Sequence, residues 1–151
     1  HQFTKIEQII IAKPEESWAL HEELLKNCTD LWDSLGIHYE VVNICTGDMG
    51  TVAAKKYDLE AWIPGAGQYK EIVSCSNCTD YQANRLSIRY GQPGHPNQPI
   101  VHTLNSTAVA TSRALVAIME QSQLEDGRVA IPEVLQPFMG GQTVLEPCNW
   151  G

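Results

Sequence analysis

The pattern of apolar and polar positions predicts that the chain begins with a strand, a helix and a second strand. Residues 3–12 form an isoleucine-rich, β-branched run that is typical of a strand. Pro14 and the two glutamates after it are typical of a helix start. Leucine and tryptophan then recur at roughly helical spacing until Gly36, which favours a helix end. Residues 38–44 have the composition of a second strand.

The middle of the chain combines short strands with short turns. The pattern predicts a loop at residues 45–50, a short helix at 53–56, strands at 58–63 and 68–75, and a short helix at 78–86. Residues 91–99, rich in glycine and proline, form a loop that tolerates insertion.

The last third supplies one more strand and the clearest helix. A strand is predicted at residues 99–104 and a helix at 106–121. This helix has few polar positions, so we expect it to be largely buried. Few strand–helix–strand units occur along the chain. The predicted fold class is therefore α+β, with a mainly antiparallel sheet flanked by helices, rather than a doubly wound sheet.

Composition narrows the possible functions. The 151 residues, 43% of them hydrophobic, suit one globular domain. A net charge of −8 with scattered lysines and arginines argues against a primary nucleic-acid surface, although one pocket could still hold an anion such as ATP. The chain has no apolar run of membrane-spanning length and no signal peptide, so we expect no membrane contact. An odd count of five cysteines favours reduced thiols in the cytoplasm.

The stretch Ser74-Cys75-Ser76-Asn77-Cys78 holds two cysteines at the spacing of a metal or redox motif. A structural zinc site commonly needs a second such pair, and the sequence has none. A thioredoxin-like motif needs a parallel strand–helix–strand unit, which the pattern does not favour. We therefore interpret Cys75 and Cys78 as small packing residues at the end of a core strand.

Three charged residues fall on predicted elements that are mostly apolar and are therefore expected in the core. Arg113 lies within the predicted apolar helix, where a buried guanidinium needs a fixed anion such as a phosphate. A salt bridge to a core carboxylate is the alternative. Glu7 and Glu71 lie on β-rich runs and could face solvent, since strands alternate. Together the three predict a polar pocket over one face of the sheet.

Several long segments closely resemble seryl-tRNA synthetases, in the same order along essentially the whole chain. They read HQFTKIE, CTGDMGTVAAKKYDLEAWIPG, YKEIVSCSNCTDYQANRLSIRY, VHTLNSTAVATSRALVAIMEQ and DGRVAIPEVLQPFMGG. The resemblance implies a class II aminoacyl-tRNA synthetase catalytic fold. It also implies a two-step reaction, in which ATP and serine give seryl-adenylate and serine then passes to tRNA(Ser).

The resemblance also implies an ATP site with bound Mg²⁺. Phe3 resembles the residue that stacks on adenine, and Arg113 resembles the arginine of motif 3 that grips the phosphates. Glu71 and Ser74 resemble the contacts to ATP and Mg²⁺. On this basis Arg113 and Glu71 are the candidate catalytic residues.

A serine pocket is implied beside the ATP site. Glu7 resembles the acid that receives the serine hydroxyl, and Lys5 is expected to line the same pocket. Asn105 and Thr107 resemble the serine-side residues that precede motif 3. SCSNC then becomes the end of an active-site strand, in which Ser74 is the functional residue.

The family's helical tRNA arm, motif 1 and the first strand of motif 2 lie upstream of the part that matches. We therefore expect residues 1–151 to be a single partial catalytic domain of a parent enzyme that is a homodimer. Alone, this part is expected to fold poorly or self-associate, and not to charge tRNA. Asn84, where the family usually has arginine, and the tail QTVLEPCNWG depart from the pattern. A synthetase-like binding or regulatory protein, or a ligase that loads an amino acid onto a carrier protein, remains an alternative.

Overall fold

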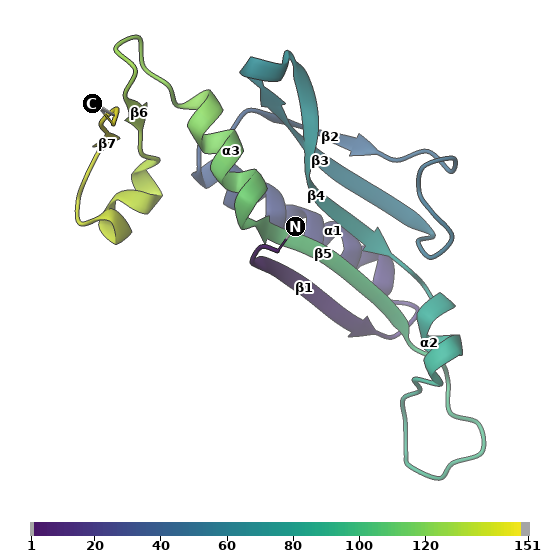
Figure 1. Cartoon of the computed structure of the whole chain (residues 1–151). Helices are drawn as coiled ribbons and strands as arrows, with labels where there is room; N and C mark the ends of the chain where they lie inside the picture. Colours follow the sequence, from purple (N-terminus) through teal and green to yellow (C-terminus); the bar gives the residue numbers. More distant parts are fainter. Residues whose placement is uncertain (1, 149–151) are drawn as a thin grey trace.

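The computed structural model describes residues 2–148 and consists of a five-stranded antiparallel sheet with helices packed against it (Figure 1). In chain order the elements are β1 (Lys5–Ala12), α1 (Ser17–Ser34), β2 (Tyr39–Asn43), β3 (Lys55–Ile63), η1 (Pro64–Ala66), β4 (Gln68–Asn77), α2 (Tyr81–Leu86), β5 (His102–Ala110), α3 (Thr111–Gln121), β6 (Val129–Ala130), η2 (Glu133–Met139) and β7 (Val144–Leu145).

The strand order of the sheet is β1-β5-β4-β3-β2, and every neighbouring pair is antiparallel. The predicted α+β class is therefore confirmed. Strand β5 lies between β1 and β4, so the last long strand joins the first to the middle of the sheet. Strand β1 forms one edge, where Ile6, Ile9 and Ile11 are exposed. Short β6 and β7 form a separate hairpin beyond the end of α3 (Figure 1).

Helix α1 covers one face of the sheet. Its residues Leu24, Cys28 and Trp32 recur at intervals of four, which places them on one side of the helix, and all three are buried. Leu24 packs with Cys75 of β4, whereas Trp32 belongs to a cluster that also contains Ala117 of α3. Both helices thus bury apolar side chains in the core, and we call the sheet face opposite α1 the open face.

The helix also carries a buried histidine. The ring Nε2 of His21 lies 3.1 Å from the carbonyl oxygen of Cys75, to which it donates a hydrogen bond. His21 is completely buried and stacks on Tyr57. Burial lowers the pKa of its imidazole, because the charged form loses its hydration.

Two β-bulges interrupt the sheet where charged residues cluster. In the β3–β4 pair, Leu59 opposes Val73 but Glu60 opposes Glu71, so Ile72 is the extra residue. In the β1–β5 pair, Glu7 opposes Thr107, and the next residue pair skips Ala108. The extra residue Ile72 resets the alternation of β4 and brings Glu71 to the open face. Thr107 lies on that face by the regular alternation of β5, because its neighbour Ser106 contacts Cys28 of α1.

Most predicted elements form, but two assignments are wrong. Residues 53–56 do not form a helix, because Lys55 and Lys56 begin strand β3. Residues 106–110 also belong to a strand rather than a helix, since β5 runs to Ala110 and α3 begins at Thr111. The expected burial of this helix is wrong as well, because Leu115 and Val116 are exposed on α3.

Within residues 2–148, no helix is long and apolar enough to cross a membrane. The last three residues of the predicted atypical tail, 149–151, lie outside the described part, as does His1.

Candidate functional site

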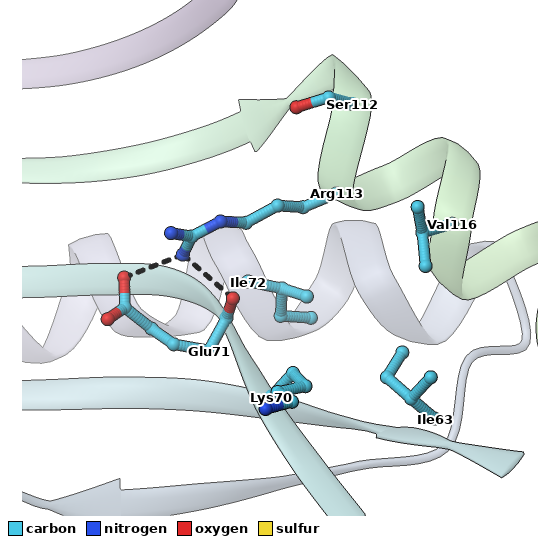
Figure 2. Close-up of a pocket in the computed structure, with 7 residues that line it drawn as sticks. All are labelled: Ile63, Lys70, Glu71, Ile72, Ser112, Arg113 and Val116. Atoms are coloured by element: carbon cyan, nitrogen blue, oxygen red, sulfur yellow. Dashed lines mark hydrogen bonds and ion pairs between the residues drawn. The ribbon is translucent and has the colours of Figure 1, made fainter. Parts of the chain in front are cut away.

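An ion pair joins the beginning of α3 to the middle of β4. The Nη1 atom of Arg113 donates hydrogen bonds to Oε1 of Glu71, at 2.9 Å, and to the Glu71 carbonyl oxygen, at 2.8 Å (Figure 2). The salt bridge to a carboxylate, which was the alternative to a phosphate partner, is therefore present. The prediction that Arg113 is buried in the middle of a helix is wrong, because it is the third residue of α3 and its side chain is 50% exposed.

This ion pair lies at a cavity of about 530 Å³. The cavity is lined by Ile63, Lys70, Glu71, Ile72, Ser112, Arg113 and Val116. Figure 2 shows the guanidinium reaching across from α3 to Glu71, while the apolar side chains form the other side. The cavity therefore combines one acid, Glu71, and two bases, Lys70 and Arg113, with a mostly apolar surface, which is the usual composition of a small-molecule site.

Glu7 forms a second polar group on edge strand β1, which is separated from β4 by β5. Its carboxylate pairs with Lys5 and accepts a hydrogen bond from Oγ1 of Thr107, at 3.1 Å. The Glu7 side chain is 29% exposed, so this acid can still accept a further donor. The prediction that Glu7, Glu71 and Arg113 line one cavity is only partly correct. Glu71 and Arg113 share a cavity, whereas Glu7 is not among its lining residues.

Asn105 lies two residues before Thr107 on β5. It contributes to a smaller pocket of about 210 Å³, lined by residues 49–53, Ser76, Cys78, Gln82 and Asn105. Phe3 precedes β1 and its side chain is about half exposed, with a relative exposure of 48%. An exposed aromatic ring is available to stack on a planar ligand.

Ser74 lies on β4 directly opposite Asp58 of β3. Burial raises the pKa of Asp58, while the charge of Lys56 and the neighbouring Ser74 hydroxyl oppose that rise. This carboxylate was not predicted as a site residue. The signal was present in the alternation of KYDLEAW, because Leu59 and Ala61 are buried in the core and Asp58 must then face the other side.

The two cysteines of SCSNC are buried packing residues, as predicted. Cys75 is completely buried and Cys78 is 3% exposed, and both are free thiols. Burial raises the pKa of Cys75 to about 12, so its thiol stays protonated near neutral pH. A protonated thiol is neither a good nucleophile nor a metal ligand. Among residues 2–148, no three His, Cys, Asp or Glu side chains cluster as metal ligands.

Comparisons with known proteins agree with this architecture. Residues 1–122 match the family described as tRNA synthetase class II core domain (G, H, P, S and T). The chain is 59% identical over 140 residues to the serine–tRNA ligase of Archaeoglobus fulgidus, and 60% identical over 146 residues to that of Methanocella arvoryzae. These matches cover 92% and 96% of the chain but 31% and 34% of the relatives. The chain thus spans about a third of their length.

Two solved structures share the fold closely. Seryl-tRNA synthetase from Pyrococcus horikoshii, complexed with ATP, has a TM-score of 0.94 and 55% identity, and it matches 99% of this chain and 33% of its own. The cytoplasmic serine–tRNA ligase from Naegleria fowleri, in complex with AMP, has a TM-score of 0.93 and 47% identity, over 99% of this chain and 36% of its own. The resemblance to seryl-tRNA synthetases is thereby confirmed, and the chain belongs to the family of class II tRNA synthetase core domains.

Proposed function

We propose that the chain carries part of the catalytic site of a serine–tRNA ligase. In this proposal the protein activates serine with ATP to form seryl-adenylate and transfers serine to tRNA(Ser). The Arg113–Glu71 ion pair at the cavity is the observation that carries the proposal. The similarity to serine–tRNA ligases, including structures complexed with ATP and with AMP, supports it.

Arg113 is assigned to the ATP phosphates. A cation in the first turn of a helix is electrostatically unfavourable, because the helix N-terminus already carries partial positive charge. Helix α3 has no acidic residue in its first turn and instead has Arg113 there. Both the helix terminus and the guanidinium therefore attract an anion, and a planar guanidinium suits phosphate oxygens. Phe3 is assigned to stacking on adenine.

Glu71 and Ser74 are assigned to Mg²⁺. Both offer oxygen atoms, which this hard cation prefers, and Mg²⁺ in nucleotide sites is usually held by one or two carboxylates together with phosphate oxygens. Glu71 and Ser74 are three residues apart on β4, with the extra residue Ile72 between them. The donor set therefore fits the cation. When bound, Mg²⁺ neutralises phosphate charge and so favours attack by an anionic carboxylate.

Glu7, Lys5, Thr107 and Asn105 are assigned to serine. The Glu7 carboxylate would accept the serine hydroxyl, while Thr107 and Lys5 hold that carboxylate in place. Alanine, which lacks the hydroxyl, would cover the Glu7 carboxylate without supplying this donor, at a cost of about 1–3 kcal/mol. Threonine keeps the hydroxyl, so its rejection requires a steric barrier instead.

In the first step, a carboxylate oxygen of serine attacks the α-phosphorus of ATP and pyrophosphate leaves. In the second step, a hydroxyl of the terminal adenosine of tRNA attacks the acyl carbon, and AMP leaves. Both steps bring anionic groups together, so positioning and electrostatic stabilisation supply most of the catalysis. Further parts of the proposal are a homodimeric parent enzyme and a cytoplasmic location.

The test is serine-dependent exchange of pyrophosphate into ATP by the full-length protein that contains this chain. We expect exchange with serine, and at most weak exchange with alanine or threonine. Wild-type protein that binds ATP but shows no serine-dependent exchange would contradict the proposed activity and favour a binding or regulatory role. Exchange that prefers another amino acid would contradict the assignment of serine.

A further inference from the structure

Asp58 is a buried carboxylate on the open face of the sheet that the roles proposed above do not use. The residue is 3% exposed. Its Oδ2 atom lies 3.3 Å from Nζ of Lys56, whereas Oδ1 is buried and has no hydrogen-bond partner among residues 2–148. A buried carboxylate oxygen without a donor is destabilising, so its retention calls for a specific explanation.

Asp58 lies on β3, next to the candidate cation ligands on β4. Its register partner on β4 is Ser74, so the two side chains lie next to each other on the same face, and the unpartnered Oδ1 is an acceptor for the Ser74 hydroxyl. The charge of Glu71 also acts on Asp58, as expected for an acid on the same face of the adjacent strand. Lys56 supplies one positive charge to this group. Arg113 supplies a second at the far side of Glu71.

A carboxylate is useful at this position because of how a serine side chain such as Ser74 binds a cation. A hydroxyl binds a cation through its oxygen lone pairs, so its hydrogen must point to another acceptor. A carboxylate that accepts this hydrogen fixes the hydroxyl's orientation and makes its oxygen a better donor to the cation. A bound dication would in turn reduce the electrostatic penalty of the buried carboxylate.

We propose that Asp58 is a positioning residue for the divalent-cation site. Its carboxylate accepts the Ser74 hydroxyl hydrogen and so orients the Ser74 oxygen toward the cation. This inference rests on the assignment of Glu71 and Ser74 to Mg²⁺ in the proposed function. Asp58 acts through Ser74 and does not itself touch the cation.

A purely structural role makes a different prediction. If the Lys56–Asp58 pair only stabilises β3, replacing Asp58 would weaken all ligand binding in proportion to lost folding. If Asp58 positions Ser74, the loss would be confined to binding that depends on the cation. The distinguishing quantity is the factor by which Mg²⁺ tightens nucleotide binding.

The experiment is calorimetric titration of the full-length protein with the unreactive analogue α,β-methylene-ATP, with saturating Mg²⁺ and with EDTA. In Asp58→Asn, we expect the Mg²⁺-dependent gain in affinity to fall about 10-fold or more, the range for loss of a partner behind a metal ligand. Binding in EDTA should stay the same. Glu40→Gln is the matched control, because it removes one carboxylate charge from the same face but lies on edge strand β2, two strands away from β4. Its change should be within about twofold, since Glu40 is exposed and its charge is screened by solvent and salt.

Further variants make the result decisive. If Asp58 acts through Ser74, Asp58→Asn should add no further loss in a Ser74→Ala background. Additive losses in that double variant, or an unchanged Mg²⁺-dependent gain in Asp58→Asn, would overturn the inference. Should Asp58→Asn fail to fold, Asp58→Ser carries the same expectation. Glu71→Gln tests the cation site itself. An unchanged Mg²⁺-dependent gain in Glu71→Gln contradicts the cation site, whereas a gain that is lost in Glu71→Gln but kept in Asp58→Asn contradicts only the role of Asp58.

Discussion

Replacing Arg113 with alanine should separate folding from catalysis, because the two depend on this side chain to very different degrees. The Arg113 and Glu71 side chains are 50% and 44% exposed. An ion pair this exposed is screened by solvent and contributes about 0.2–1 kcal/mol to stability. The unfavourable position of the arginine at the N-terminus of α3 offsets part of even that amount.

The expected effect on catalysis is much larger. A preorganised cation that stabilises charge developing on the phosphates contributes on the order of 3–4 kcal/mol, which corresponds to a rate factor of about 10²–10³. In the full-length protein, Arg113→Ala should therefore lower serine-dependent pyrophosphate exchange at least about 100-fold. Its melting temperature should fall by no more than a few degrees. Arg113→Lys should recover only part of the rate, because lysine keeps the charge but lacks the planar fork.

The matched control is Arg128→Ala. Arg128 pairs with Asp126 at 2.8 Å, and the two side chains are 39% and 53% exposed, so this ion pair resembles Arg113–Glu71 but lies outside the candidate site. Its loss should leave exchange unchanged. If Arg113→Ala retains exchange within about threefold of wild type, less than 1 kcal/mol, the assignment of Arg113 to the phosphates is wrong. An equally large loss in Arg128→Ala would attribute the effect to overall charge.

Three further predictions concern other parts of the chain. Glu7→Gln should raise the KM for serine about 10-fold or more and leave the KM for ATP unchanged, as measured by pyrophosphate exchange; equal changes in both would contradict the division of the site. Because burial lowers the pKa of His21, the unfolded chain binds more protons, so stability should be fully present above pH 6.5 and fall as pH drops below it. Urea titrations should show a slope of up to about 1.4 kcal/mol per pH unit there, which His21→Gln should remove; an unchanged slope in that variant would mean that other groups cause it. Replacing the fully buried Trp32 with alanine should lower the free energy of unfolding by about 3–5 kcal/mol, and a loss below 1 kcal/mol would contradict the assigned core.

Local sequence signals predicted the fold class and most elements, and they failed where pairing between distant strands decided the structure. Residues 106–110 contain two alanines and continue into the apolar pattern of the helix, but β1 pairs along this segment and β4 also pairs with Ser106. Lys55 and Lys56 are good helix formers, yet both pair across β3 and β4. Tertiary context therefore overrode propensity in both segments.

The candidate site was likewise predicted only in part from local sequence signals. Arg113 and Glu71 were singled out as charges on apolar segments, and the structure brings them together. The bulge that turns Glu71 to the open face could not be predicted, because a bulge depends on the register between two strands. Asp58 was missed because its burial arises from neighbouring strands, although its alternation with core residues was visible in the sequence.

The central claim is that one face of the sheet holds a nucleotide and serine side by side. The most direct measurement is calorimetric titration of the full-length protein with seryl-sulfamoyl-adenosine, an unreactive mimic of seryl-adenylate. We expect one mimic per site, with binding weakened at least about 10-fold both in Phe3→Ala, by loss of stacking at the adenine end, and in Glu7→Gln, by loss of the charge on the acceptor at the serine end. Wild-type affinity in both variants, or no binding by the wild-type protein, would contradict it.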